Sequence, residues 1–226
     1  MADHESETAS EVLEKGVHFS LKVKSVVKEV KSNATISIYF ANNYFHVSLN
    51  AKTEGGSAEG NVKSDVYFGQ KENEFYAIDA ANKKYAVLTS SDAEDLLDTV
   101  KDAVDEILDE GSSTSLLSML DKFPESSSTT EIGGLKYTYE MKSKGEGHLC
   151  LKSTTSYTGK DEDKKNETVT KLVVDNYRFA SFDSSTTVLG SSTSVKVSAK
   201  YSISKSLPSV SGMEKVASVE IPDLDI

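Results

Sequence analysis

Apolar and polar residues alternate in segment after segment of this 226-residue chain, and this alternation constrains the fold more than any other feature. Successive side chains of a β-strand point to opposite faces, so the alternation gives each strand one apolar face. Residues 75–88 show the pattern twice, as FYAID and KYAVL, with a short polar turn between the two runs. We therefore predict a β-hairpin at this position.

The same alternation fills most of the sequence before residue 90. In the segment HFSLKVKSVVKEV, Phe19, Leu21 and Val23 share one face and lysines occupy the other. Together with the hairpin, the pattern predicts about six strands in an unbroken meander. The other alternating runs of this part are ATISIYF, YFHVSLN and NVKSDVYF.

The period changes between residues 90 and 111, where apolar residues recur at helical spacing and acidic residues fill the opposite side. Ser91 followed by Glu94 predicts a capping box at the start of this helix, and Gly111 marks its end. A shorter apolar segment, SLLSMLDKFP, follows, and we expect a second helix that Pro124 stops.

Strand patterning resumes after the polar sequence ESSSTTEIGG, which we expect to be a linker. The alternating runs that follow predict about five further strands, the last ending near residue 203. Residues 208–226 have weak periodicity and are expected to cross the surface or to end disordered. We predict a disordered leader over residues 1–10, a single domain over residues 11–207 and a C-terminal extension over residues 208–226.

These elements predict an α+β fold that is mainly antiparallel β. We expect a strongly curved sheet, or half-barrel, of about eleven strands, with a pair of helices inserted mid-chain that covers its concave face. The helices could complete an ordinary core or form a lid over an apolar cavity, and periodicity leaves both readings open. The residues that could line such a cavity are Phe45, Val47, Val66, Phe68, Leu96, Val100, Val104, Leu116, Leu120, Leu135 and Tyr137.

The charge of the chain argues against several classes of partner. The formal net charge is −11, so phosphate backbones and anionic lipid surfaces should be repelled, and we expect no nucleic-acid partner. Arg178 is the only arginine, which excludes an arginine cluster that would clamp phosphate. No apolar stretch approaches the length that a membrane-spanning helix requires.

The sequence contains no recognisable catalytic or metal-binding pattern. The four histidines, at positions 4, 18, 46 and 148, have no ligand-like spacing. Cys150 is the only cysteine, so no disulfide can form within the chain, and we expect its thiol to be buried and inert. Residues 161–163 are acidic, but lysines follow them where a calcium loop needs oxygen ligands. We predict no catalytic residue, no metal site and no cofactor, and hence no enzyme.

The order of elements, with the motif Tyr76-x-Ile78-Asp79 followed by Lys83-x-Tyr85, resembles the LolA/LppX/LprG superfamily of exported lipoprotein carriers and lipid-binding lipoproteins. It is also similar to LolA-like lipoproteins of Gram-positive bacteria. The resemblance covers roughly residues 10–205. It implies a bacterial, extracytoplasmic protein of the cell envelope that is anchored at the cell surface through a lipidated N-terminal cysteine. That cysteine and its export signal are absent from this sequence, as they would be if the signal had been replaced by an initiating Met.

Two hypotheses about function follow from this reading. The first is a monomeric, non-catalytic lipoprotein domain that binds a lipid or another hydrophobic ligand, such as an acyl chain, between the sheet and a helical lid. The alternative is a structural or interaction module of the cell surface with a filled core and no small-molecule ligand, whose exposed strand edges pair with a partner. A hydrolase would need a convergent polar constellation that the sequence does not show.

Overall fold

The structure is a computed structural model that describes residues 11, 14–55, 59–111, 125–145, 147–161, 165–176 and 178–220. Side chains are described for these residues except 100, 101, 103–111, 144 and 145. The second predicted helix, over SLLSMLDKFP, and the predicted leader over residues 1–10 lie outside the described residues.

Six strands precede the helix, as the alternation predicts, and each pairs antiparallel with the next. The hairpin predicted over residues 75–88 is confirmed as the last pair of this meander. The six strands are β1 (Val17–Val27), β2 (Val30–Ala41), β3 (Tyr44–Glu54), β4 (Gly60–Lys71), β5 (Glu74–Asp79) and β6 (Lys84–Leu88).

A second antiparallel meander of six strands follows the helix, where about five were predicted. A short thirteenth strand, β13 (Glu214–Lys215), pairs parallel with β6. The strands of the second meander are β7 (Ser126–Ile132), β8 (Leu135–Gly145), β9 (His148–Tyr157), β10 (Asn166–Asp175), β11 (Arg178–Val188) and β12 (Ser191–Tyr201).

The prediction of a polar linker over ESSSTTEIGG was wrong, because most of this segment is the edge strand β7. Gly133 and Gly134 both have positive φ angles, of 59° and 81°, and connect β7 directly to β8. Two central residues with positive φ are typical of the tight type I′ hairpin turn. An edge strand with two wetted faces needs no apolar alternation, so the hydrophobic pattern did not reveal it.

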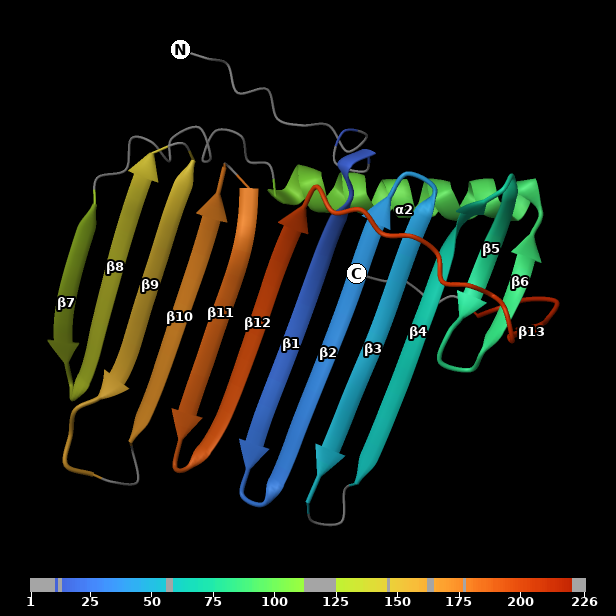
Figure 1. Cartoon of the computed structure of the whole chain (residues 1–226). Coiled ribbons are helices and arrows are strands. Elements are labelled where there is room, and N and C mark those ends of the chain that lie inside the picture. The colour runs from blue at the N-terminus through green and yellow to red at the C-terminus, as the bar shows by residue number, and fades with distance from the viewer. Residues whose placement is uncertain are drawn as a thin grey trace.

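The two meanders form one open sheet because β1 pairs with β12. Ten registered pairs join them, from Val17 opposite Tyr201 to Val26 opposite Ser192. The strand order is β13-β6-β5-β4-β3-β2-β1-β12-β11-β10-β9-β8-β7 (Figure 1). The open, mainly antiparallel sheet with a helix inserted between its halves is therefore confirmed, with thirteen strands in place of about eleven.

Helix α2 (Ser90–Gly111) connects strands near opposite edges of the sheet. The strands β6 and β7 are about 50 Å apart, at about 4.8 Å per strand. The 22 residues of α2 span about 33 Å of this distance at 1.5 Å per residue. The helix consequently lies across the strands, close to their ends, rather than along them (Figure 1).

The start of α2 differs slightly from the prediction. The capping residue is Thr89 and not Ser91, because Thr89 Oγ1 accepts a hydrogen bond from the Asp92 amide at 3.2 Å. The Thr89 hydroxyl also lies 2.6 Å from Asp92 Oδ2 and donates to it. Thr89 and Asp92 have the same spacing as the predicted pair Ser91 and Glu94, and the helix begins two residues after β6 ends at Leu88.

We call the face of the sheet that carries Phe45 and Phe68 the helix face, because α2 packs on it. Phe40, Phe45, Phe68 and Ala93 are fully buried in one cluster there. Leu96, Leu97 and Phe75 are among the partly buried side chains that pack against this cluster. A smaller cluster, centred on Leu149 and Val174 of β9 and β10, lies in the second meander.

We call the opposite face the strap face, because residues 202–213 cross it after β12 ends (Figure 1). This C-terminal strap is held by side chains that rise from the sheet. The Tyr39 hydroxyl donates to the carbonyl of Ile203 at 2.5 Å, and the Tyr44 hydroxyl donates to that of Ser206 at 3.3 Å. The predicted C-terminal extension over residues 208–226 overlaps the last part of this strap, and its bounds stay a prediction.

Gly16 lies where the start of β1, Tyr39 and the strap meet. It has a φ of +76°, and a Cβ atom added there would lie 2.2 Å from the backbone oxygen of Ile203. Both facts require glycine at this position.

We expect Gly16→Ala to destabilise the protein by about 2 kcal/mol or more, from left-handed strain and the clash together. Gly190→Ala is the matched control, because Gly190 has a φ of +77° and open space around it. The control should cost about 1 kcal/mol. Urea unfolding of both variants checks this, and equal losses would show that the contact with the strap is not tight.

Candidate functional site

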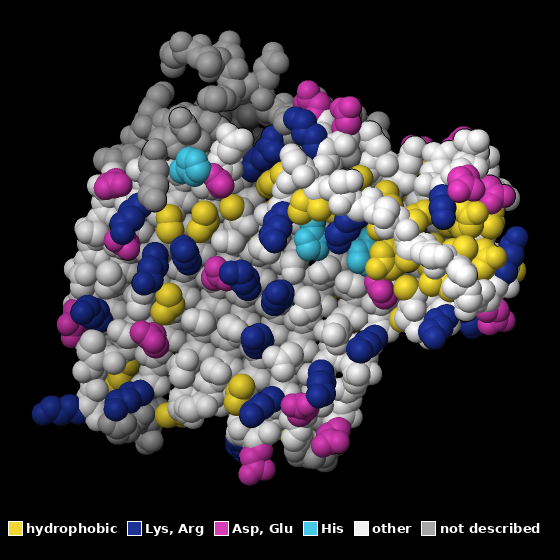
Figure 2. Space-filling view, in the orientation of Figure 1, with side chains coloured by type: hydrophobic (Ala, Val, Ile, Leu, Met, Phe, Trp, Pro, Cys, Tyr) yellow, Lys and Arg dark blue, Asp and Glu magenta, His cyan; other side chains and the backbone are white. Residues whose placement is uncertain are grey.

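Over most of the sheet, the charged side chains lie on the strap face and not on the helix face. On β1 to β4 and β7 to β12, the register places no Asp, Glu, Lys or His on the helix face. Arg178, beside the irregularity in the β10–β11 pairing, lies 5.0 Å from the centre of the Tyr201 ring. The strap face of the same strands carries many lysines (Figure 2).

An unbroken row of large apolar residues crosses the helix face at right angles to the strands. Each member lies directly opposite the next in the register, and none is fully buried. The row extends about 34 Å, at about 4.8 Å per strand. We call it the apolar row, and its members are Leu49, Ile36, Leu21, Val197, Phe182, Leu172, Leu151 and Met141.

Exposed apolar side chains also concentrate on the helix face. Every large apolar residue that is exposed within a described strand points to this face. Apolar area left in water on one neutral face is typical of a binding surface. These residues are Val27, Val62, Ile132, Leu135, Tyr137, Tyr139 and Val188.

The predicted cavity residues divide into separate groups. Phe45, Val47 and Phe68 belong to the buried cluster, against which Leu96 packs. Val66 is also buried, next to Val47 in the register. Phe45, Val47 and Phe68 therefore belong to the core on which α2 packs.

Leu135 and Tyr137 are placed far from that cluster. They lie on β8, with exposed fractions of 45% and 47%. Seven strand intervals separate them from Phe45 on β3, so they share its face but do not contact it. Val100 and Val104 fall within α2, but their side chains are outside the described set, as are residues Leu116 and Leu120 altogether.

Neither of two hollows formed by described residues is lined by the predicted set. One, of about 450 Å³, lies where β10 and β12 end and β11 begins, and it includes Arg178, Phe179 and Tyr201. The other, of about 400 Å³, lies on the strap face over β1 and β9 to β12. An enclosed cavity between α2 and the sheet therefore remains a prediction.

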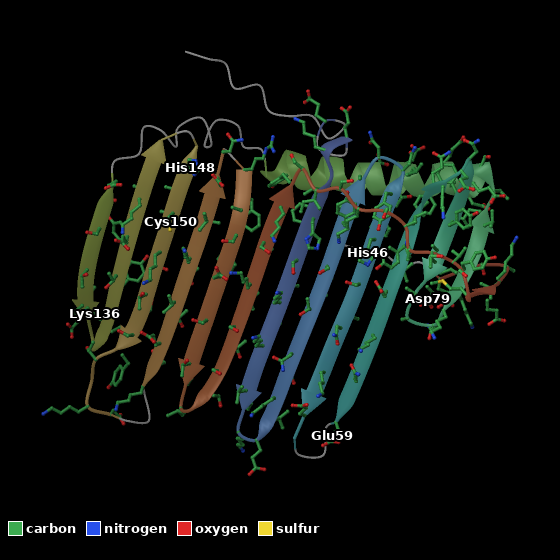
Figure 3. The ribbon with its side chains drawn as sticks, viewed as in Figure 1. His46, Glu59, Asp79, Lys136, His148 and Cys150 are labelled. Carbon is green, nitrogen blue, oxygen red and sulfur yellow. The ribbon has the colours of Figure 1, made fainter. Side chains whose placement is uncertain are left out.

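A polar cluster that the sequence did not reveal lies on the strap face beside the strap (Figure 3). His46 on β3 is only 8% exposed, and its Nε2 atom lies 2.7 Å from Asp65 Oδ1 on β4. The Tyr67 ring stacks on the imidazole with 3.9 Å between ring centres. His46 Nδ1 is buried without a hydrogen-bond partner among the described protein atoms.

The side chains next to this cluster hold the strap. No hydroxyl or thiol in the described part bonds to His46, so a nucleophile of the kind that a histidine activates is not paired with it. The neighbouring Tyr39 and Tyr44 instead bind strap carbonyls, and Lys205 of the strap lies 5.0 Å from the centre of the Tyr39 ring. In the described part, no group of three or more His, Cys, Asp or Glu residues could hold a metal ion.

His148 and Cys150, which the sequence analysis also considered, both lie on the strap face of β9. His148 Nδ1 lies 2.6 Å from Asp175 Oδ1 on the neighbouring strand β10. Cys150 is half-buried on the strap face and not buried as expected, because it lies on the wetted side of β9. No described helix is long and apolar enough to cross a membrane.

Comparison with known proteins leaves the family unassigned. No family model matches the chain, and the search of curated proteins found no match. Among solved structures, the crystal structure of LprF from Mycobacterium bovis is similar over 89% of this chain and 96% of that chain. The sequence identity is 11% and the TM-score is 0.27. So low a score establishes no shared arrangement, and membership of the LolA/LppX/LprG superfamily stays a prediction.

Two histidines of the strap face make the strap region sensitive to pH. Burial lowers the pKa of His46, although Asp65 opposes this effect, and burial followed by the charges of Lys205 and Lys200 lowers the pKa of His18. A histidine in the unfolded chain has a pKa of about 6.5. The unfolded state therefore binds more protons just below that pH, and the stability of the fold falls as pH decreases.

We expect the free energy of unfolding to be nearly constant between about pH 7 and about pH 9 and to fall as pH decreases from about 6.5. Urea unfolding at a series of pH values measures this. His46→Gln keeps a side chain that can donate to Asp65 but cannot titrate, so it should flatten the dependence. If the wild-type protein became more stable towards acid pH, the lowered pKa values of His46 and His18 would be contradicted.

Proposed function

We propose that this chain is a non-catalytic binding protein for an apolar ligand, an acyl chain or a similar lipid, which lies on the helix face beside α2. The single observation that supports this most strongly is the combination of exposed apolar side chains and absent charge on that face. A protein that only needed to complete its core would leave the far half of this face polar.

The apolar row matches the chemistry of an acyl chain. Its members are half-buried, so each retains apolar surface that a ligand could remove from water. Each methylene transferred from water contributes about 0.8 kcal/mol, and about a dozen would contribute roughly 10 kcal/mol before ordering costs. In this proposal the ligand lies against the apolar row. It could also extend into a cavity under α2, if such a cavity exists.

A second row on the same face offers uncharged hydrogen-bonding groups. Ser25 and Thr193 lie 3.4 Å apart by their hydroxyl oxygens, and two further such pairs lie 3.2 Å apart on neighbouring strands. This hydroxyl row runs parallel to the apolar row, four residues along each strand. An amphiphile could place its chain on the first row and a neutral polar end on the second.

We also propose that the domain is extracytoplasmic and anchored by lipid at its N-terminus, as the family resemblance implies. The neutral binding face and the charged opposite face are compatible with a monomer that carries a lipid outside the membrane. The native coding sequence before residue 2 tests this part, since a cytosolic start would remove its basis.

The interaction module remains the second candidate, and one observation favours it. The strand β7 ends the sheet with its outer edge unpaired by any described strand, and Ile132 on it is 74% exposed. Such an edge can accept a strand from a partner.

Organic extraction of the purified protein followed by mass spectrometry should recover a lipid in stoichiometric amount. A fluorescent fatty acid should also bind to protein stripped of that lipid. Recovery of no lipid together with no binding of the probe would remove the lipid proposal and leave the interaction module.

Val195→Asp should weaken binding of the fluorescent fatty acid by about tenfold or more, because it places a charge on the helix face beside the apolar row. Ser194→Asp is the matched control, since it adds the same charge to the strap face one residue away in the same strand. Urea unfolding shows whether each variant is folded. Equal weakening by both variants would place the ligand elsewhere.

A further inference from the structure

Four lysines lie in one line across the strap face, and we call them the lysine row. They are Lys22 on β1, Lys196 on β12, Lys171 on β10 and Lys152 on β9, with Asp183 of β11 in the middle of the line. All four lysines are exposed. The line is about 19 Å long, at about 4.8 Å per strand.

Within this row, lysines lie opposite lysines on neighbouring strands, and their repulsion destabilises the protein when no ligand is bound. Lys22 lies directly opposite Lys196, and Lys171 lies directly opposite Lys152. Like charges opposite each other in an antiparallel sheet are destabilising, and acidic partners would relieve the repulsion.

Acidic residues do not neutralise the row. Asp183 is the one carboxylate within it, and its Oδ1 atom lies 3.2 Å from Lys196 Nζ. Beyond Lys152 comes Glu140, whose salt bridge is with Lys142 at 2.8 Å. Lys22, Lys24 and Lys171 form no ion pair with any described residue.

The row borders a hollow that could hold a ligand. The hollow of about 400 Å³ on the strap face is lined by all four lysines of the row together with Lys24 and Asp183. Five ammonium groups and one carboxylate thus surround a space in a chain whose formal net charge is −11. Figure 2 shows lysines spread over this part of the surface.

We propose that the lysine row binds a linear polyanion that carries no bases, such as a polyphosphate or phosphodiester polymer. The charges follow a line, which matches an extended chain. A bilayer is flat and would extend in both directions over the sheet, whereas these charges follow a single line across the strands. Single-stranded nucleic acid is usually held by stacking on aromatic side chains, and no aromatic residue lines this hollow.

This site is separate from the proposed lipid surface, because the register places the lysine row and the apolar row on opposite faces of the same strands. It differs from the expectation, drawn from net charge, that polymers of phosphate are repelled. The charge of the whole chain does not describe the local field over β1 and β9 to β12, since screening confines each field to about 10 Å at 0.1 M salt.

The test is binding of fluorescently labelled inorganic polyphosphate to the purified full chain at about 50 mM salt, where screening is weak. The double variant Lys22→Gln/Lys171→Gln should weaken binding at least about tenfold. Asp183→Asn should strengthen it about threefold, because it removes the only negative charge in the row. The matched control is Lys63→Gln/Lys136→Gln, which removes the same charge from exposed positions of the same face outside the row, and it should bind as the wild type does.

Four results would overturn the proposal. The first is no binding of polyphosphate, and the second is equal weakening by the control pair. The third is binding to vesicles of phosphatidylglycerol and phosphatidylcholine without binding to polyphosphate. The fourth is tighter binding of oligothymidylate than of polyphosphate. Binding of the fluorescent fatty acid should be unchanged in all these variants, which keeps the outcome independent of the lipid proposal.

Discussion

The pairing of β1 with β12 is the interaction on which the rest of the structure depends. Each meander is built from neighbouring strands in sequence, so its hairpins close short loops at low entropic cost. The contact between Val17 and Tyr201 instead joins residues 184 positions apart. Without it, the apolar row and the lysine row would each be broken between β1 and β12. Gly16, Tyr39 and the strap gather at one end of this pairing, where the strap adds contacts that reinforce it.

The sheet is too wide for α2 to cover the whole helix face. The helix α2 is shorter than the distance between the strands that it connects, so it covers only one region of the helix face. The side chains under it, such as Phe45 and Phe68, are fully buried, whereas those farther along the same face are half-buried or exposed. Charge would be tolerated at the uncovered positions, yet none is found on β1 to β4 or on β7 to β12 except near Arg178. The absence of charge where burial does not require it is the physical basis of the proposed lipid surface.

The positions with clear alternation were predictable. In β1 the order of Phe19, Leu21 and Val23 against Lys22 and Lys24 assigned both faces correctly, because period-two alternation is a local property. The strand β7 escaped detection because an edge strand can be polar on both faces. The candidate site was predicted only in part. Phe45, Val66 and Phe68 share a face with Leu135 and Tyr137 as expected, but no local pattern could show how many strands lie between them.

The sequence by itself determined the type of each strongly patterned element and which side chains share a face, since both follow from backbone geometry within a few residues. Only the tertiary structure decided which strands are neighbours, because register and strand order depend on contacts between distant segments. That order converts scattered residues into the apolar row, sets Lys22 against Lys196, and brings His46 to Asp65. Function in this molecule depends on rows that cross the strands, and a one-dimensional pattern contains no information about that direction.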